Sequence, residues 1–476
     1  MLLRHSALYL LARGVPGIVN FLAVAIYTRV LSPDEYGRYA LVIAGVGLFN
    51  VIFFQWLRLS LLRFLPAHLP NPKELLSAVL GGYVGTVLVT TLLGILTAVL
   101  WPDGTLRELL LMAIPLSWAQ SWFDLNLVVA RSNLQPRRYG MMSGVKAVSA
   151  LCLGSSAVFL GLGAEGLLLG LLAALLIASV LLGSSQWRGI IPKLPPDVMK
   201  RLLGYGLPFT ATFALSFIVS SSDRFLIAWF LGEGAAGVYS ASYNLTQQSL
   251  TLLMMIVNTA SYPLIARALE IYGEEAARRQ LLKNAELLFG VAFPSTVGLI
   301  VLAPNVAAVS LGSAFQEEAS NLMPLIAVAA LMEGIRAFHF DLAFQLGQRT
   351  VGQVWVMGGA AAVNFALNFW WIPKFGLMGA AWATVIAYAV ALTLSANFGR
   401  KIFVIPFEWR TVGKLIAAAT AMIPIWVVGT MTETWVGLLG AGFGAVFVYA
   451  LLLVTFDAGG LRFKLLGMLR RYKHEP

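Results

Sequence analysis

The chain has 476 residues, of which 59% are apolar and only 12% are charged, and its formal net charge is +11. Its mean hydropathy is +0.81. Too few polar residues are present to cover a water-soluble globule of this size, so the composition excludes a soluble protein and indicates an all-α polytopic membrane protein.

Long apolar stretches follow one another along the whole chain. A helix needs about 20 mostly apolar residues to cross the hydrocarbon core of a bilayer, and the turn and charge signals divide the sequence into stretches of about this length. We expect about 14 transmembrane helices, at 7–29, 37–64, 76–100, 106–130, 138–160, 164–187, 203–230, 236–264, 285–303, 321–346, 350–372, 376–399, 411–430 and 434–456.

The distribution of Lys and Arg predicts the orientation, because these residues accumulate in cytoplasmic loops. With the N-terminus inside, nearly all loop cations fall on one face, and Arg29, Arg38, Arg107 and Lys374 fall outside it. We therefore expect both termini to be cytoplasmic. The cations are spread over short loops rather than gathered in a basic domain, which indicates contact with membrane lipids and no nucleic-acid partner.

A short pattern at a turn recurs after 200 residues. In LSPDEYGRYA the pattern consists of Leu31, Gly37 and Tyr39. In LGEGAAGVYS the same residue types stand at Leu231, Gly237 and Tyr239. Repeats inside helical membrane proteins build a central site at their interface, and an even number of helices per repeat makes the two repeats parallel. We predict two six-helix lobes at 1–187 and 203–400, a cytoplasmic linker at 188–202, an extra hairpin at 401–456 and a basic cytoplasmic tail at 457–476.

Charged residues occur inside the predicted helices of both lobes. Each costs roughly 2.5 to 3.5 kcal/mol on insertion scales, so each needs water, a partner or a function. We expect a central cavity whose substrate contacts come from Arg13, Arg58, Lys146, Arg224, Arg336, Asn244 and Gln247. The candidates for coupling transport to Na⁺ or H⁺ are the carboxylates Asp124, Asp223, Glu333 and Asp341. The alternative is that the charges neutralise each other as buried pairs and that the polar rows join helices by hydrogen bonds.

Several chemistries lack their usual sequence signals. Cys152 is the single cysteine and the four His residues are scattered, so we expect no disulfide, no metal site and no cofactor. No phosphate-binding GxxxxGK[ST] motif is present, and no long outside loop is expected that could carry catalytic residues. These observations favour a transporter over an ATP-driven pump or a membrane enzyme.

Three segments carry a resemblance to a known family. TRVLSPDEYGRYALVIAGVGLF, LRLSLLRFLP and LPFTATFALSFIVSSSDRFLIAWFLGEGAAGVYSASYNL resemble bacterial polysaccharide flippases, which export lipid-linked O-antigen and exopolysaccharide repeat units. These proteins belong to the multidrug/oligosaccharide-lipid/polysaccharide superfamily. In this chain Arg63 and the Asp223–Arg224 pair match positions that recur in the family.

The resemblance implies a V-shaped pair of lobes, like that of the MATE transporters, in the bacterial inner (cytoplasmic) membrane. By alternating access the protein would move an undecaprenyl-pyrophosphate-linked oligosaccharide to the outer leaflet, for O-antigen, exopolysaccharide or capsule synthesis. The implied partners are a polysaccharide polymerase and chain-length proteins, and the protein itself is expected to be a monomer.

Two related functions stay open. A MATE-type multidrug or cation antiporter has the same fold, but its cationic substrates would favour an acidic cavity, whereas the intramembrane charges here have one cation in excess. A flippase for another lipid-linked precursor is the second.

Overall fold

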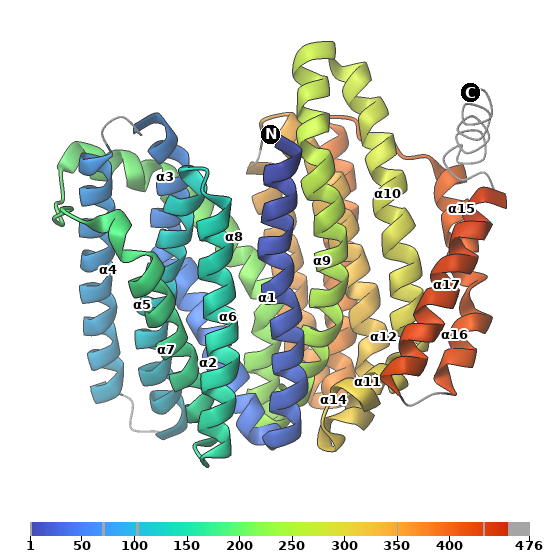
Figure 1. Cartoon of the computed structure of the whole chain (residues 1–476), viewed down its shortest axis with the longest axis horizontal. Coiled ribbons are helices and arrows are strands. Elements are labelled where there is room, and N and C mark those ends of the chain that lie inside the picture. The colour runs from blue at the N-terminus through green and yellow to red at the C-terminus, as the bar shows by residue number, and fades with distance from the viewer. Residues whose placement is uncertain (1, 69–71, 101–103, 350, 432–433, 456–476) are drawn as a thin grey trace, which may run out of the picture. The chain divides into compact units, whose positions relative to one another are not determined.

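The computed structural model describes residues 2–68, 72–100, 104–349, 351–431 and 434–455. The predicted tail at 457–476 lies outside the described residues. Within the described ranges every regular element is helical, which confirms the all-α fold (Figure 1).

The first part of the chain forms eight α-helices. One π-helical and two 3₁₀ segments accompany them: α1 (Leu2–Val30), α2 (Pro33–Phe49), η1 (Asn50–Phe54, π), α3 (Gln55–Phe64), η2 (Leu65–His68, 3₁₀), α4 (Lys73–Leu100), α5 (Gly104–Ser132), α6 (Pro136–Phe159), α7 (Gly163–Leu182), η3 (Ser184–Trp187, 3₁₀) and α8 (Pro196–Leu231).

The second part adds nine more α-helices and a second π-helical segment: α9 (Glu233–Tyr272), α10 (Glu274–Val301), α11 (Ala303–Ser310), α12 (Ser313–Ile335), η4 (Arg336–Phe340, π), α13 (Leu342–Leu346), α14 (Val351–Arg400), α15 (Trp409–Thr420), α16 (Ile423–Thr430) and α17 (Trp435–Thr455).

In the described residues ten helical segments are long and apolar enough to cross a membrane, and two shorter apolar segments, Pro16–Val30 and Leu439–Thr455, accompany them. The predicted stretches at 350–372 and 376–399 both fall on α14, which is interrupted by non-helical dihedral angles at Gly376 (φ 59°, ψ −143°). The predicted stretch at 411–430 is divided between α15 and α16. The count of about 14 spans is therefore roughly matched by helices of unequal length.

The chain divides into two compact units. Unit 1 comprises Met1–Ser240 and Asn368–Gly376, and unit 2 comprises Ala241–Leu367 and Leu377–Pro476. Unit 1 thus includes α8 and the first two turns of α9. The predicted lobes at 1–187 and 203–400 follow the sequence repeat and stay a prediction.

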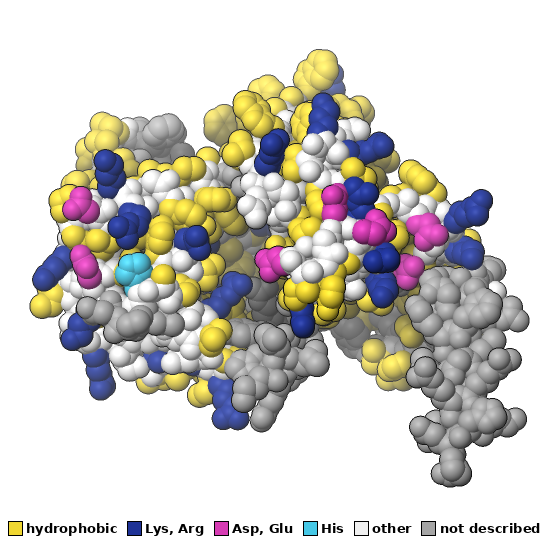
Figure 2. Space-filling view, turned by 90° about the horizontal axis from the view of Figure 1, so that it is seen from above, with side chains coloured by type: hydrophobic (Ala, Val, Ile, Leu, Met, Phe, Trp, Pro, Cys, Tyr) yellow, Lys and Arg dark blue, Asp and Glu magenta, His cyan; other side chains and the backbone are white. Residues whose placement is uncertain are grey.

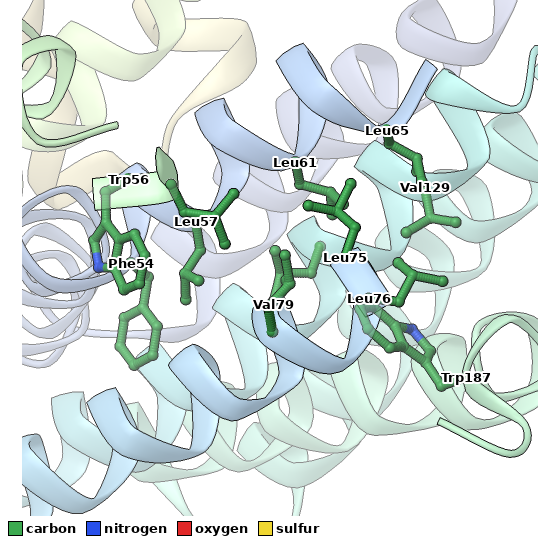
Figure 3. Packing of buried hydrophobic residues seen from close by; sticks show 13 residues of the cluster. Phe54, Trp56, Leu57, Leu61, Leu65, Leu75, Leu76, Val79, Val129 and Trp187 are labelled. Carbon is green, nitrogen blue, oxygen red and sulfur yellow. The ribbon is translucent and has the colours of Figure 1, made fainter. Parts of the chain in front are cut away.

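One hydrophobic cluster of unit 1 lies where α3, α4, α5 and α8 meet (Figure 3), and a second lies between α2, α5, α6 and α7. Leu57 and Leu61, one turn apart on α3, are fully buried in the first cluster. Helix α3 also approaches α8 closely, since the Ser60 hydroxyl donates to the Leu202 carbonyl at 2.7 Å. A Cβ at Gly206 would lie only 2.5 Å from the Trp56 carbonyl oxygen. Helix α3 is thereby fixed between α8, which Ser60 contacts, and α5, which Arg58 contacts.

In unit 2, α9 and α10 form an antiparallel hairpin (Figure 1). Helix α9 has 40 residues, about 60 Å at 1.5 Å per residue, which is twice the thickness of the hydrocarbon core. Its last turns and the first turns of α10 therefore extend beyond the apolar region, and Ile271 and Tyr272 are exposed at the tip.

The ends of the helices carry many charged side chains. Figure 2 looks onto the end at which the α9–α10 turn lies, and it shows Lys and Arg as separate points rather than one continuous basic patch. Such a distribution is typical of loop cations at a lipid headgroup layer.

Candidate functional site

In unit 1 a network of charged and amide side chains joins α3 to α5. Gln55 and Arg58 are three residues apart on α3, and Gln120 and Asp124 are four apart on α5, so each pair shares one helix face. Arg58 donates through Nη1 to Asp124 Oδ2 and through Nη2 to Gln55 Oε1. Gln120 Nε2 donates to Asp124 Oδ1 at 2.9 Å. Both oxygens of the Asp124 carboxylate are therefore engaged.

Lys146, on α6, lies beside this network. Its Nζ is 5.8 Å from the centroid of the Phe123 ring, and the charge of Asp124 acts on it. Among the described residues no carboxylate oxygen lies within 4.0 Å of Lys146 Nζ, and no hydrogen bond to it is found. The ammonium group is half-buried without an ion pair of its own.

A second carboxylate of unit 1 is held at the junction of α8 and α9. Asp223 is fully buried, and its Oδ2 accepts a hydrogen bond from the Tyr239 hydroxyl at 2.6 Å. Its Oδ1 accepts from the backbone N–H of Arg224 at 2.9 Å, and the Arg224 side chain interacts with it electrostatically. The repeated tyrosine of LGEGAAGVYS thus binds the acid of the Asp223–Arg224 pair.

The two repeated glycines lie where α2 and α9 come together. A Cβ added at Gly37 would lie 1.8 Å from the Glu233 carbonyl oxygen, and one at Gly237 would lie 2.2 Å from the Pro33 carbonyl oxygen. Both are far below a van der Waals contact, and both obstacles are backbone atoms. The sequence repeat is therefore explained by a backbone contact that excludes any side chain at either position.

Charged side chains surround this glycine contact. Arg38 Nε lies 3.4 Å from Glu233 Oε2, and Arg38 Nη1 lies 3.6 Å from Glu165 Oε1 on α7. At the start of α2, Ser32 and Glu35 form a capping box, in which the Ser32 hydroxyl accepts from the Glu35 N–H at 3.3 Å. The contact therefore joins three helices of unit 1.

In unit 2 a carboxylate on α12 is bound by side chains of two other helices. Gln247 Nε2, on α9, donates to Glu333 Oε2. The Tyr388 hydroxyl, on α14, also hydrogen-bonds to Glu333, and Tyr388 is almost fully buried. The predicted contact residue Gln247 and the predicted coupling residue Glu333 are thus brought together.

An ion pair follows within a few residues. Arg336 Nη1 lies 2.5 Å from Asp341 Oδ2, and Asp341 Oδ1 accepts from the Ser395 hydroxyl at 2.5 Å. Arg336 is 7% exposed and Asp341 is 4% exposed, so the pair is buried. A Coulomb interaction between Arg336 and Glu333 connects this pair to the previous group.

The remaining predicted residues are placed as follows. Asn244 is half-buried on α9, one turn before Gln247, and Arg224 is half-buried on α8. Arg13 belongs to helix α1, but its side chain lies outside the described residues. Whether the predicted residues line a central cavity stays a prediction.

Sequence reasoning missed four partners of the intramembrane charges: Gln55, Gln120, Tyr388 and Ser395. The first two stand three and four residues from the charges they bind, a spacing that could have identified them. The last two come from a helix distant in sequence and leave no such signal. Among the described residues no group of three or more His, Cys, Asp and Glu side chains could hold a metal ion.

Relatives of known or assigned function resemble most of the chain. A Shigella flexneri protein named as an O-antigen transporter is 21% identical over 412 residues, which cover 83% of this chain and 96% of the relative. A Haloferax volcanii protein named as a low-salt glycan biosynthesis flippase, Agl15, is 21% identical over 433 residues, covering 87% and 88%.

Solved structures share the fold. The lipid II flippase MurJ, in an inward closed conformation, superposes with a TM-score of 0.80 at 15% identity, covering 96% of this chain and all of that one (100%). An inward-facing MATE multidrug transporter superposes with a TM-score of 0.64 at 13% identity, covering 83% and 97%. At these identities the similarity shows the fold.

The family is shown by a sequence profile. The profile described as "Polysaccharide biosynthesis protein" matches residues 26–320, which is more than half of the chain. This range contains the segments that resemble the polysaccharide flippases, and it includes both repeated glycines. The chain therefore belongs to the polysaccharide biosynthesis protein family.

Proposed function

We propose that this chain is a flippase that moves an undecaprenyl-pyrophosphate-linked oligosaccharide repeat unit from the cytoplasmic to the outer leaflet by alternating access. The family and the relatives named as a transporter and a flippase support transport in polysaccharide biosynthesis. The more specific proposal is that the substrate is a lipid-linked pyrophosphate, and this part rests on the charges inside the membrane helices.

The observation that carries the proposal is the set of cations within apolar helices: Arg58, Lys146, Arg224 and Arg336. Buried cations in a bilayer are costly, and they mark the paths of ions and of charged substrates. A pyrophosphate group suits such a path, because Lys and Arg bind phosphate oxygens through charge-assisted hydrogen bonds. The amides and hydroxyls that surround the cations can replace water around sugar hydroxyls.

The membrane potential favours this direction of transport. An anion that leaves a negative cytoplasm gains about 2.3 kcal/mol per charge for each 100 mV, or roughly a fiftyfold change in the equilibrium ratio. The protein then has only to lower the barrier for the polar headgroup, while the polyprenyl tail stays in lipid.

We further propose Glu333 as the carboxylate through which Na⁺ or H⁺ is coupled, if export uses an ion. Its direct partners, Gln247 and Tyr388, are neutral side chains. Asp124 and Asp341 each hold an arginine instead, so protonation of either would leave a buried cation without its partner.

The same proposal places the chain in a bacterial inner membrane with both termini cytoplasmic. Its product is an outer-leaflet repeat unit, which a polymerase and chain-length proteins would use. A monomer is sufficient for this scheme, because both repeats are present in one chain.

Reconstitution tests the function directly. Proteoliposomes with the purified protein and a fluorescent undecaprenyl-pyrophosphate oligosaccharide should lose inner-leaflet label faster than empty liposomes, as measured by quenching from outside. An interior-negative potential, set with valinomycin and K⁺, should accelerate this loss. Label that moves no faster than in empty liposomes would reject the flippase, and uptake of a cationic dye in its place would favour the MATE-type antiporter.

A further inference from the structure

The charges inside the membrane helices of unit 1 do not balance. Two carboxylates, Asp124 and Asp223, lie well within these helices, whereas the other acids of the unit stand near helix ends or in loops. The cations inside the same helices are Arg58, Lys146 and Arg224, together with Arg13, whose side chain is not described. At least one cation therefore has no carboxylate of its own.

Lys146 is such a cation. Arg58 forms an ion pair with Asp124, and the charge of Arg224 acts on Asp223. The two oxygens of Asp124 accept from Arg58 and Gln120, and among the described residues Arg58 is the cation within 4.0 Å of this carboxylate, whereas Lys146 lies farther away. The charge of Asp124 is thus shared by two cations, and the group Arg58, Asp124 and Lys146 has a net charge of +1.

The helices around Lys146 offer it no other acid among the described residues. Helix α6, which carries Lys146, packs against α1, α5 and α7, and the other acid of α5 is Glu108, near the N-terminal end of that helix. Residues 2–15 of α1, whose side chains are not described, contain no Asp or Glu in the sequence. On α7 the single acid is Glu165 in the first turn, which is bound to Arg38. The nearby Phe123 ring stabilises the ammonium group by a cation–π contact but leaves its three N–H donors available.

We propose that Lys146 is the residue of unit 1 that binds the pyrophosphate of the lipid carrier, and that Arg58 instead braces α3 against α5. The inference rests on the proposed function and assigns distinct roles to two cations that the sequence treats alike. A lysine suits this role because its ammonium is a compact charge with three rotatable donors, which can follow a phosphate as the substrate moves.

Binding of undecaprenyl pyrophosphate to the purified protein in detergent tests this assignment. Lys146→Met should weaken binding at least tenfold, and Lys146→Arg, which keeps the charge, should retain most of the affinity. Lys374→Met is the matched control, because Lys374 also lies over an aromatic ring, 5.0 Å from the centroid of Trp370, but is exposed. This control should bind as the wild type does.

A double variant separates binding from a structural role. In Lys146→Met/Asp124→Asn the carboxylate charge is removed, so Arg58 is no longer neutralised and the group regains its net charge of +1. Binding should then recover by at least threefold over Lys146→Met. A purely structural lysine would show no such recovery.

The outcomes distinguish the two proposals. If the wild type binds undecaprenyl pyrophosphate no better than the neutral undecaprenol, the proposed function fails and this inference with it. If the wild type prefers the pyrophosphate and Lys146→Met binds equally well, the inference alone is wrong. Competition by inorganic pyrophosphate as strong as by the lipid would show a free-phosphate site and would also overturn it.

Discussion

Replacing Gly37 by alanine tests the contact between the two repeated motifs. The new Cβ would lie 1.8 Å from the carbonyl oxygen and 2.6 Å from the carbonyl carbon of Glu233. Backbone atoms cannot rotate away as a side chain can, so α2 and α9 must separate by more than about 1 Å to restore a normal contact. Overpacking of this kind costs about 1 to 3 kcal/mol, and the separation also lengthens the Arg38–Glu233 ion pair.

The assay is thermal unfolding of the purified protein in detergent, with Gly85→Ala as a control. A Cβ at Gly85, on α4, would have no other atom within 4 Å, so alanine there should leave stability unchanged or raise it by about 0.5 to 1 kcal/mol. Gly37→Ala should unfold at a lower temperature than both the wild type and this control. If Gly37→Ala and Gly85→Ala unfold together, the glycine contact does not constrain these helices as described.

Three further substitutions probe the buried groups. Arg336→Met should destabilise unit 2 by about 3 to 5 kcal/mol, because it leaves Asp341 buried without its cation. The double variant Arg336→Met/Asp341→Asn should recover much of this loss. Denaturant unfolding of the single and double variants measures both effects. Tyr239→Phe removes a hydrogen bond to the buried Asp223 and should cost about 1 to 3 kcal/mol, seen as a lower melting temperature, and an unchanged one would contradict the hydrogen bond. Leu57→Ala removes a fully buried side chain from the cluster of Figure 3 and should lower the free energy of unfolding by about 2 to 5 kcal/mol. A decrease below about 1 kcal/mol would mean that the neighbouring side chains fill the cavity that the substitution leaves.

Composition and periodicity were sufficient to predict the class of fold, because a bilayer requires long apolar helices whatever their contacts. The predicted boundary between 350–372 and 376–399 coincides with the kink in α14 at Gly376. Composition and periodicity did not predict that the stretch at 411–430 is divided between α15 and α16. The repeat predicted that Gly37 and Gly237 are related, but their direct approach depends on tertiary packing.

For the charged residues, the helical spacing of Gln55 and Arg58 and of Gln120 and Asp124 could have identified neighbours on regular helices, but this spacing does not hold through a π-helical turn. A regular α-helix would place Glu333, Arg336 and His339 on one face. In η4 the turn is wider, because the Asp341 N–H donates to the Arg336 carbonyl at 2.8 Å, and the residues that follow are therefore rotated relative to that face. Arg336 consequently binds Asp341, and His339 packs against Phe289 with ring centroids 5.4 Å apart. Pairings between distant helices have no periodic signal and required coordinates.

The chain passes between the two units inside helices rather than through loops. The boundaries fall at Ser240–Ala241 in α9 and at Leu367–Asn368 and Gly376–Leu377 in α14. In α14 the last boundary coincides with Gly376, whose positive φ of 59° a residue with a Cβ rarely adopts, and Pro373 removes one hydrogen bond a turn earlier. The interruption at Gly376 therefore gives α14 a defined point at which the direction of the helix can change through a few backbone torsions.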